Sequence, residues 1–271
     1  MTQPTIKLND GRQIPQLGLG LWQTGAGEAA EVVRAALQAG YRHFDTAAIY
    51  GNEDGVGQGL AGARREDVFV TTKLWNDAQG FDATLKAARE SLNKLRLDYV
   101  DLYLIHWPTP RRGLYVETWR ALIRLREEGL ARSIGVSNFM PEHIERLVAE
   151  TGVTPAINQI ELNPRFQQRA LRAFHAQHGI ATESWAPLGR ARFLDDPVIV
   201  GLAAKHGRTP AQVVIRWHLD EGLIAIPKTV RRERLQENFN VFGFTLDAGD
   251  RAALGALDRA DGRSGPDPMT F

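Results

Sequence analysis

Short apolar runs alternate along this chain with longer stretches in which apolar residues recur every three or four positions. The first pair is an apolar run over residues 17–22 and a helical pattern over 28–39, which Gly40 follows in the place of a C-cap. Apolar runs predict strands over residues 17–22, 41–45, 68–74, 100–106, 132–137, 156–161, 180–185 and 223–227. Helical periodicity predicts helices over residues 28–39, 53–60, 82–95, 115–128, 141–150, 170–178, 198–206, 210–221, 231–239 and 246–257.

A hairpin is predicted before this alternation begins. Residues 5–8 and 13–17 flank Asn9-Asp10-Gly11, and an Asp-Gly pair is a strong signal for a tight β-turn. Strands that alternate with helices imply right-handed crossovers and a parallel sheet. Eight such units in 271 residues are typical of a closed barrel. The sequence therefore predicts an α/β fold, a (β/α)8 TIM barrel with an N-terminal β-hairpin and extra C-terminal helices.

The barrel prediction also says where to look for chemistry. No linker or shift of composition divides the chain, so residues 1–271 are expected to form a single domain. Catalytic residues of such barrels lie at the carboxyl ends of the strands or just after them. The polar and aromatic residues at those places are Trp22, Asp45, Lys73, Trp75, His106, Trp107, Ser137, Asn138, Gln159, Trp185 and Lys228.

Composition and charge narrow the possible partners. The 33 basic and 32 acidic side chains nearly balance, so neither nucleic acid nor an anionic membrane is expected as the main partner. The absence of cysteine excludes disulfides, thiolate zinc sites and cysteine nucleophiles. The N-terminus has no apolar signal core and no run is long enough to span a bilayer, so a cytoplasmic protein is expected. A monomer is expected as well, although no sequence feature addresses the oligomeric state.

Four polar side chains near the ends of successive predicted strands suggest a catalytic group. Asp45, Lys73 and His106 end three strands, and Tyr50 follows Asp45 by five residues. A buried lysine is costly unless it is paired, and Asp45 is the candidate partner. For that pair alone, a salt bridge at the barrel rim without chemistry is the alternative. A neighbouring ammonium lowers the pKa of a phenol. With an imidazole that donates to a substrate oxygen, the four groups predict a proton donor to a carbonyl that is being reduced.

A glycine-rich segment offers a competing interpretation. Residues 25–30, GAGEAA, match G-x-G-x-x-A between a predicted strand and helix, and Asp45 lies twenty residues after Gly25. This is the spacing of a Rossmann dinucleotide fingerprint, whereas the alternative is a flexible turn before a helix. Eight strand–helix units fit a closed barrel better than an open six-stranded sheet. Gln23 and Thr24 also separate the strand from the first glycine, so the barrel is favoured.

Two further motifs carry weaker signals. Residues 135–139, GVSNF, begin like a nucleophile elbow but lack the second glycine, so Ser137 is interpreted as a polar group at a strand end. His175 and His178 stand three residues apart on a predicted helix, a spacing that suits a metal ion. No acid or cysteine occupies a matching position, so a solvated helix face is expected and no metal site is predicted.

A basic run begins the predicted helix over residues 231–239. Residues 228–234 read KTVRRER. Cations at a helix N-terminus oppose the macrodipole, which favours a bound anion between backbone N–H groups and basic side chains. An exposed helix start without a ligand is the alternative.

The motifs together resemble those of one enzyme family. DTAAIYGNE, TTKLW, LYLIHWP, GVSNF, NQIELNP, SWAPLG and IPKTVRRERLQEN stand in the order found in aldo-keto reductases. The similarity covers essentially the whole chain and is greatest to the bacterial 2,5-diketo-D-gluconic acid reductases. The resemblance implies an NADPH-dependent carbonyl reductase on a barrel.

The resemblance also implies a role for each matching residue. Tyr50 would be the proton donor, Asp45 and Lys73 its tuning pair, and His106 the group that orients the carbonyl. Ser137, Asn138 and Gln159 would hold the nicotinamide carboxamide, and Trp185 would stack on its ring. The remaining positions that match cofactor contacts are Leu188, Gly189 and Arg190 near the pyrophosphate, Lys228, Thr229, Val230, Arg231 and Arg234 around the 2′-phosphate, and Glu237 and Asn238 at the adenine.

The expected substrate is a small carbonyl compound. Trp22, Ile49, Trp75 and Trp107 would line its pocket together with His106. The loop over residues 108–114 and the tail over 261–271 are short, which favours an open pocket and broad specificity. 2,5-Diketo-D-gluconate, methylglyoxal-type compounds and simple aldehydes are the candidates. The alternative from another class is an NADPH-binding regulatory or structural protein of the same fold with little turnover.

Overall fold

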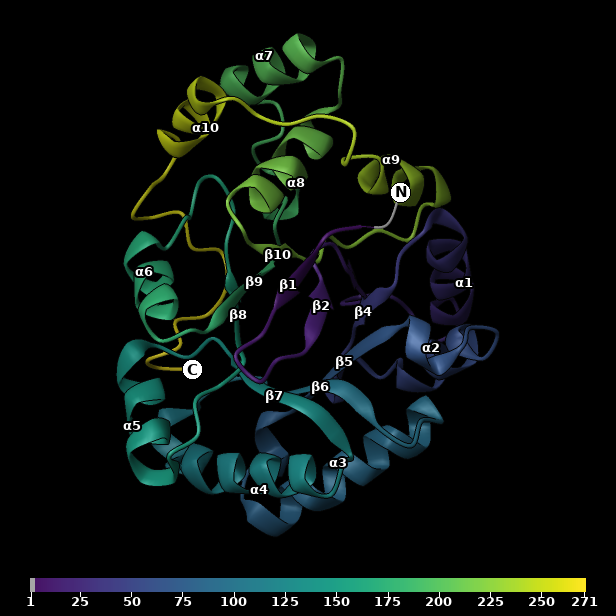
Figure 1. Cartoon of the computed structure of the whole chain (residues 1–271), viewed down its shortest axis with the longest axis vertical. Helices are drawn as coiled ribbons and strands as arrows, with labels where there is room; N and C mark the ends of the chain where they lie inside the picture. Colours follow the sequence, from purple (N-terminus) through teal and green to yellow (C-terminus); the bar gives the residue numbers. More distant parts are fainter. Residues whose placement is uncertain (1–2) are drawn as a thin grey trace.

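Eight parallel strands form one sheet that curls into a barrel (Figure 1). The computed structural model describes residues 3–271 and places the strands in the order β10-β9-β8-β7-β6-β5-β4-β3. They are β3 (Leu19–Gly20), β4 (His43–Asp45), β5 (Phe69–Leu74), β6 (Val100–Ile105), β7 (Ala131–Ser137), β8 (Ile157–Glu161), β9 (Ala181–Trp185) and β10 (Ile224–Ala225). The predicted (β/α)8 fold is confirmed.

The barrel closes where its first and last strands meet. Parallel bridges join Leu17 to Ala225 and Gly20 to Lys228. The first and last strands approach each other closely here, since a Cβ on Gly20 would lie 2.7 Å from the carbonyl oxygen of Ile226. Glycine is the residue that permits this approach, because it has no Cβ. Of the apolar run over residues 17–22, only Leu19–Gly20 form the strand β3.

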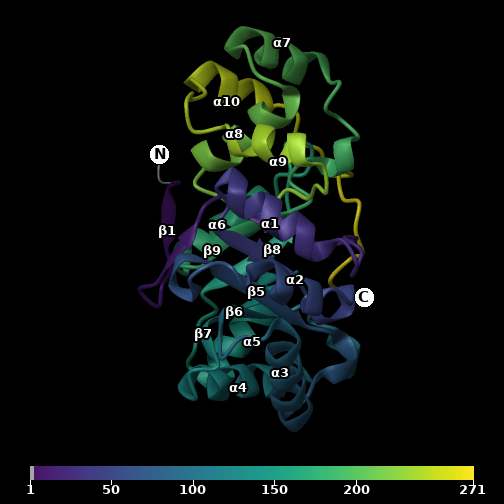
Figure 2. The ribbon, with the colours of Figure 1, turned by 90° about the vertical axis from the view of Figure 1, so that its right-hand side faces the viewer.

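Helices surround the barrel and connect its strands (Figures 1 and 2). They are α1 (Ala29–Ala39), α2 (Glu53–Leu60), α3 (Phe81–Leu95), α4 (Tyr115–Glu127), α5 (Pro141–Thr151), α6 (Arg169–Gln177), α7 (Pro197–His206), α8 (Pro210–Asp220), α9 (Arg232–Phe239) and α10 (Ala248–Gly255). Short 3-10 turns add η1 (Ala48–Tyr50), η2 (Arg65–Asp67), η3 (Asn76–Ala78), η4 (Pro110–Arg112) and η5 (Gly189–Ala191). The extra helices α7 and α10 pack against each other beyond α8, over a second apolar core.

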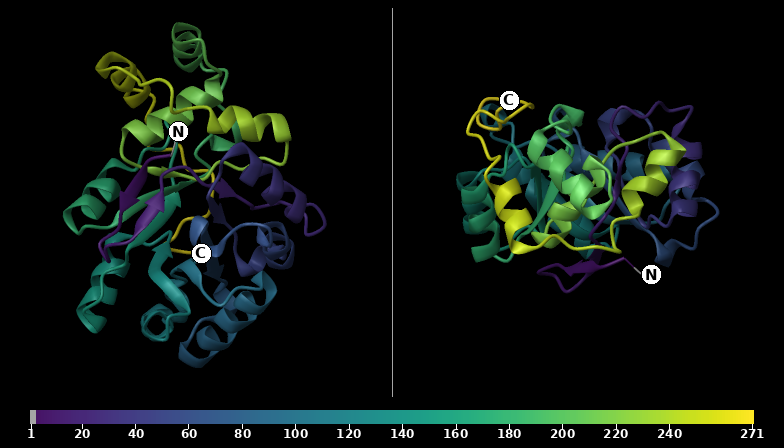
Figure 3. Two further views of the ribbon diagram at one scale, coloured as in Figure 1. Left: turned by 45° about the vertical axis from the view of Figure 1, so that its right-hand side comes forward. Right: turned by 90° about the horizontal axis from the view of Figure 1, so that it is seen from above.

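The two ends of the barrel are closed differently. The hairpin strands β1 (Thr5–Lys7) and β2 (Gln13–Pro15) pair antiparallel, with Ile6 opposite Ile14. Ile14 is buried with Leu102 and Leu104 of β6 inside the barrel, so the hairpin plugs the amino ends of the strands. The C-terminal segment lies at the other end (Figures 2 and 3). The carboxyl ends of the strands are therefore the end left for a ligand.

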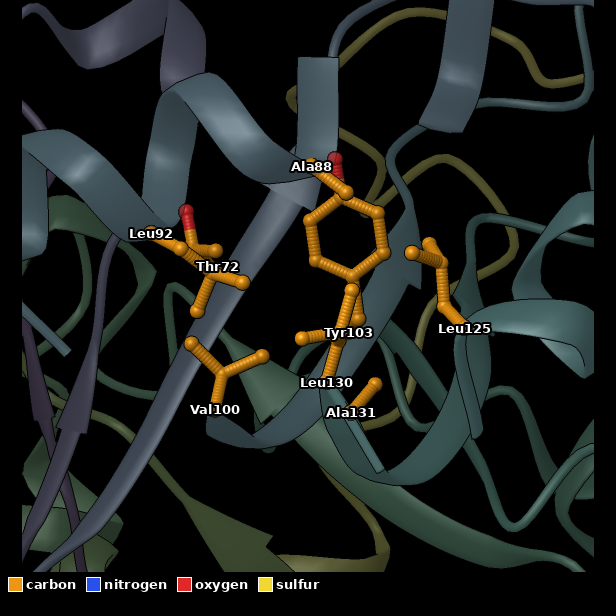
Figure 4. A pocket seen from close by; sticks show the side chains of 8 residues that line it. All are labelled: Thr72, Ala88, Leu92, Val100, Tyr103, Leu125, Leu130 and Ala131. Carbon is orange, nitrogen blue, oxygen red and sulfur yellow. The ribbon is translucent and has the colours of Figure 1, made fainter. Parts of the chain in front are cut away.

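A small gap lies between the sheet and helices α3 and α4, outside the barrel (Figure 4). Its lining is almost wholly apolar and consists of Thr72, Ala88, Leu92, Val100, Tyr103, Leu125, Leu130 and Ala131. It does not reach the carboxyl ends of the strands, so it is a packing gap and not a candidate site. Within residues 3–271, no helix is both long and apolar enough to cross a membrane.

Candidate active site

Six side chains from neighbouring strands converge at the carboxyl end of the barrel. They are Asp45 of β4, Lys73 of β5, His106 just after β6, Ser137 of β7, Gln159 of β8 and Trp185 of β9. Parallel pairing places these strand ends side by side, with Ser137 directly opposite Gln159. The structure thus brings together residues that are up to 140 positions apart in the sequence. This is expected of a barrel whose site residues lie at the carboxyl ends of its strands.

Lys73 and Asp45 form a buried ion pair. Lys73 Nζ lies 2.5 Å from Asp45 Oδ1 and donates to the carbonyl oxygen of Thr46 at 2.9 Å. Both side chains are almost completely inaccessible to water. Burial acts to lower the pKa of Lys73, but Asp45 and Tyr50 outweigh it, so the net pKa of Lys73 is raised. The lysine therefore stays charged inside the barrel.

Tyr50 ends the turn η1 close to this pair. Its ring centroid lies 5.3 Å from Lys73 Nζ and 5.8 Å from the centroid of the His106 ring, which it meets edge-on. Burial raises the pKa of Tyr50, and the charge of Lys73 opposes that effect without reversing it. The effect of Lys73 has the sign expected from the sequence. The net direction is the opposite one, because the sequence argument did not include the burial of the phenol.

His106 is neutral at ordinary pH. Burial, and next the charge of Lys73, hold the pKa of His106 well below 6.5. Its ring packs edge-on against Trp75, with centroids 5.2 Å apart. Its Nδ1 has no hydrogen-bond partner in the part of the chain that the structure describes. A neutral imidazole carries a single N–H, so His106 can offer one donor to a ligand oxygen without a change of charge.

Asn138 joins the second half of the ring into one network. Its Nδ2 donates to the His106 carbonyl oxygen and to Ser137 Oγ, both at 3.0 Å. Its Oδ1 accepts from Trp185 Nε1 at 2.8 Å. Ser137 Oγ in turn donates to the carbonyl oxygen of Gln159 at 2.8 Å. Asn138 has φ 63°, a left-handed conformation that asparagine tolerates better than most residues. The network holds the indole of Trp185 in place beside the amide groups.

Two loops lie beside the ring. Leu188, Gly189 and Arg190 follow β9 and lead into η5, where Gly189 and Arg190 both have positive φ. The guanidinium of Arg190 lies 5.0 Å from the centroid of the Trp22 ring, which comes from the loop after β3. A cation over an indole face is attractive, so this contact connects two loops from different strands.

The basic segment lies at the start of α9. Lys228, Val230, Arg231 and Arg234 are exposed and Thr229 is buried. The backbone N–H of Arg231 donates to Thr229 Oγ1 at 3.1 Å, and no side chain caps the helix. Within residues 3–271, no carboxylate lies within 4.0 Å of these three cations. An uncapped helix start beside three unpaired cations suits an anion.

Two polar residues follow on the same helix. Glu237 accepts a hydrogen bond from Thr209 Oγ1 at 2.8 Å, and Asn238 is buried. Of the two residues expected to contact the adenine, Glu237 therefore already accepts a hydrogen bond from the N-cap residue of α8.

The apolar wall of the mouth is less open than the sequence indicated. Trp22 and Ile49 are exposed, whereas Trp107 is buried. Phe271 of the C-terminal tail lies against Trp107, with ring centroids 4.6 Å apart. The expectation of an open pocket beneath a short tail is thus wrong on this side, since the tail reaches across the mouth to the tryptophan.

Glu161 is a residue that the sequence argument missed, and it anchors the tail. This buried carboxylate at the end of β8 accepts from the backbone N–H of Ser264 at 2.9 Å and of Gly265 at 3.0 Å. Gly265 packs so closely on the indole of Trp185 that a Cβ there would lie 2.5 Å from a ring carbon. NQIELNP was recognised as a motif, but only the fold shows that its glutamate faces the tail.

The prediction of a solvated helix face is wrong for His175 and confirmed for His178, which caps α6. His175 is buried, where its Nε2 contacts Asn158 Nδ2 and its Nδ1 contacts Thr182 Oγ1, each at 2.9 Å. It faces the barrel because α6 packs on β9, whereas His178 is exposed as expected. Among residues 3–271, no group of three His, Asp or Glu side chains is arranged to hold a metal ion.

Comparisons with known proteins agree with this architecture. The family model described as "Aldo/keto reductase family" matches residues 16–259. An aldo-keto reductase of Mycolicibacterium smegmatis is 55% identical over 270 residues, which cover 99% of this chain and 98% of that protein. Methylglyoxal reductase DkgA of Escherichia coli (strain K12) is 53% identical over 276 residues, with 100% and 99% covered. The crystal structure of a Gox0644 mutant in complex with NADPH superposes with a TM-score of 0.97 at 57% identity, covering 100% of this chain and 99% of that one.

Proposed function

This chain belongs to the aldo/keto reductase family, and from that premise we propose that it is a carbonyl reductase that uses NADPH. It would reduce an aldehyde or ketone to an alcohol, with Tyr50 as the proton donor. The observation that carries the proposal is the buried Lys73–Asp45 pair beside Tyr50 and a neutral His106. A binding protein would need the cofactor contacts alone, whereas these four groups serve a proton transfer.

The residues present fit NADPH. The three unpaired cations near α9 suit a dianionic 2′-phosphate, which gains charge-assisted hydrogen bonds that a ribose hydroxyl cannot make. The indole N–H of Trp185 donates to Asn138 Oδ1, so the hydrogen bond lies at the edge of the ring. The face of the indole would then stack on the nicotinamide. Ser137, Asn138 and Gln159 would hold the carboxamide. Leu188, Gly189 and Arg190 would lie along the pyrophosphate, and the structural relative solved with NADPH supports this cofactor.

The chain's own residues would manage the substrate oxygen. When bound, the cofactor supplies a hydride to the carbonyl carbon. His106 donates a hydrogen bond to the carbonyl oxygen and orients it, and Tyr50 gives that oxygen its phenolic proton. The raised pKa of Tyr50, which burial causes, keeps the proton on the phenol before the reaction. Lys73 stabilises the phenolate that remains, and Asp45 keeps Lys73 charged.

Replacing the phenol tests this mechanism. Tyr50→Phe should lower kcat for a simple aldehyde by roughly 100-fold or more, because general acid catalysis is worth about that much. The Kd of NADPH, measured by the change in tryptophan fluorescence, should stay the same. Tyr99→Phe is a matched control, since Tyr99 is also half-buried but precedes β6 at the other end of the barrel. Equal turnover by Tyr50→Phe and the wild type would refute the assignment.

We propose small polar carbonyl compounds as substrates. Trp22, Ile49, Trp75 and Trp107 provide apolar surface, and His106 provides the polar group that fixes the oxygen. The relatives named methylglyoxal reductase DkgA support a 2-oxoaldehyde, and 2,5-diketo-D-gluconate and simple aldehydes belong to the same test. A panel of these compounds with NADPH, compared by kcat/KM, would rank them. Because all site residues come from one chain, we propose that a monomer suffices for activity.

A further inference from the structure

Glu183 is a buried carboxyl group that the mechanism above does not use. It lies on β9 directly opposite Gln159 of β8, and its side chain has no exposure to water. Branched apolar residues usually fill the inside of such a barrel, so a carboxyl group there is costly. Stability alone does not call for it, and its contacts show what it can do.

Both hydrogens of the Gln159 amide are used by carboxyl groups. Gln159 Nε2 donates to Asp45 Oδ2 and to Glu183 Oε2, each at 2.8 Å. The amide cannot turn over, since its oxygen would then face Asp45. Within residues 3–271, no protein group hydrogen-bonds to Gln159 Oε1. Gln159 therefore presents an acceptor, and not a donor, to a ligand.

His43 faces the other oxygen of Glu183, which has no hydrogen-bond partner within residues 3–271. His43 Nδ1 lies 3.3 Å from the carbonyl oxygen of Pro15, which can only accept, so Nδ1 carries the hydrogen. His43 Nε2 is then an acceptor, and it faces Glu183 Oε1 at 3.5 Å and Thr71 Oγ1 at 3.4 Å. Burial holds the pKa of His43 down to about 3, so the imidazole offers no positive charge. Glu183 Oε1 thus faces a neutral ring nitrogen and no cation, and this environment favours the protonated form of the carboxyl group.

The surrounding charges agree with a protonated Glu183. The titratable and charged groups that face it are His43 and Asp45 on β4 and Lys73 on β5. Burial, and next the charge of Asp45, raise the pKa of Glu183 to about 8, while Lys73 already pairs with Asp45. Burial raises the pKa of Asp45 as well, but Lys73 contacts Asp45 and not Glu183. We therefore assign the negative charge to Asp45, and Glu183 is the neutral carboxyl group of the two that accept from the Gln159 amide.

We propose that Glu183 is a positioning residue: its neutral carboxyl group, which lies beside His43, holds the Gln159 amide so that Gln159 Oε1 accepts from the NH₂ of the nicotinamide carboxamide. The same arrangement keeps Asp45 in place for Lys73, so one residue supports both the cofactor contact and the proton donor. This inference rests on the proposed function, because the ligand amide is that of NADPH.

Two variants and three measurements test it. Glu183→Gln keeps an acceptor for Gln159 and an N–H for His43, so its NADPH Kd and kcat/KM at pH 7 should stay within about twofold of the wild type. Glu183→Leu frees the Gln159 amide and should weaken NADPH binding by roughly tenfold, as expected for one buried hydrogen bond. In the wild type, NADPH affinity and kcat/KM should fall as the pH rises through about 8, because Glu183 then ionises beside Asp45. That fall should be absent in Glu183→Gln.

Infrared spectroscopy provides a measurement that does not depend on turnover. The wild-type protein without cofactor should show the band of a protonated carboxyl group at pH 7, which Glu183→Gln should lack. Asp250→Asn, which removes a buried carboxyl on α10, should retain it. A missing band, an unchanged alkaline fall in Glu183→Gln, or wild-type NADPH affinity in Glu183→Leu would each overturn the proposal. If Glu183→Leu does not fold, the infrared band and the pH dependence of NADPH affinity in Glu183→Gln still test the proposal. A failed Tyr50→Phe test would leave the band and the binding data standing, so the two failures are distinguishable.

Discussion

Phe271 packs against Trp107 at the mouth of the barrel, with ring centroids 4.6 Å apart and ring planes inclined by 55°. The same phenyl ring lies 6.4 Å from the Trp75 ring. Glu161 anchors the same tail by accepting from its backbone at Ser264 and Gly265. The tail is thus a wall of the proposed substrate pocket, positioned by a strand residue.

Removing this ring should change substrate binding more than chemistry. Phe271→Ala should raise KM for small aldehydes by about two- to tenfold and leave kcat within about twofold, since an aromatic pair contributes about 0.5–1.5 kcal/mol. Steady-state kinetics with saturating NADPH would measure both constants. Val200→Ala, which truncates an exposed apolar residue on α7, is the control. An unchanged KM would show that the tail does not contact the substrate.

The ion pair should matter to stability as well as to turnover. Lys73→Met leaves Asp45 buried without a cation, and breaking a buried pair costs about 3–5 kcal/mol. The free energy of unfolding in urea should fall by about that amount. Adding Asp45→Asn should recover part of it, because the uncompensated charge is then gone. If the double variant were no more stable than Lys73→Met, an unpaired charge would not be the cause.

The sequence predicted the arrangement of the strand ends because that arrangement follows from topology alone. Asp45, Lys73 and His106 lie at or next to the carboxyl ends of three strands, and parallel strands in a closed barrel bring such residues to one end. The motifs then supplied their roles by resemblance. Neither argument needs the direction in which any one side chain points.

What the sequence did not reveal depends on packing between distant segments. Gln159 and Asp45 are 114 positions apart, and their hydrogen bond, like that of Gln159 to Glu183, requires the register of the barrel interior. His175 lies on α6 and His178 caps its C-terminus, yet the contact of α6 with β9 buries only His175. The net pKa of Tyr50 was likewise beyond reach, because it depends on how burial compares with the charge of Lys73.

Cofactor preference should depend on Arg234. If this exposed cation contacts the 2′-phosphate, Arg234→Ala should weaken NADPH binding by about 10- to 100-fold, which is the range for a hydrogen bond to a charged group. NADH lacks that phosphate, so its Kd should change little. Arg232→Ala is a matched control, because Arg232 lies on the same turn of α9 but donates to Gln38 Oε1 at 2.8 Å. Equal losses for NADPH and NADH in Arg234→Ala would argue against a phosphate site here.

Buried histidines should make the protein sensitive to mild acid. Burial lowers the pKa of His43 to about 3 and those of His175 and His218 to about 4, against 6.5 for an ordinary histidine. Between pH 6.5 and about 4 the unfolded chain therefore binds protons that the folded protein does not, so stability falls as the pH falls. Each histidine contributes about 1.4 kcal/mol per pH unit in that window.

Unfolding in urea at several pH values would check the size of this effect. Near pH 5 the three histidines together should give a slope of about 4 kcal/mol per pH unit. His175→Asn should reduce the measured slope by about 1.4 kcal/mol per pH unit, since one titrating group is gone, whatever the change does to stability at pH 7. His178→Asn at the C-cap of the same helix removes an exposed imidazole and should leave the slope as it is. A free energy of unfolding that stayed constant from pH 7 to pH 5 would mean that these imidazoles accept protons in the folded state, which their complete burial opposes.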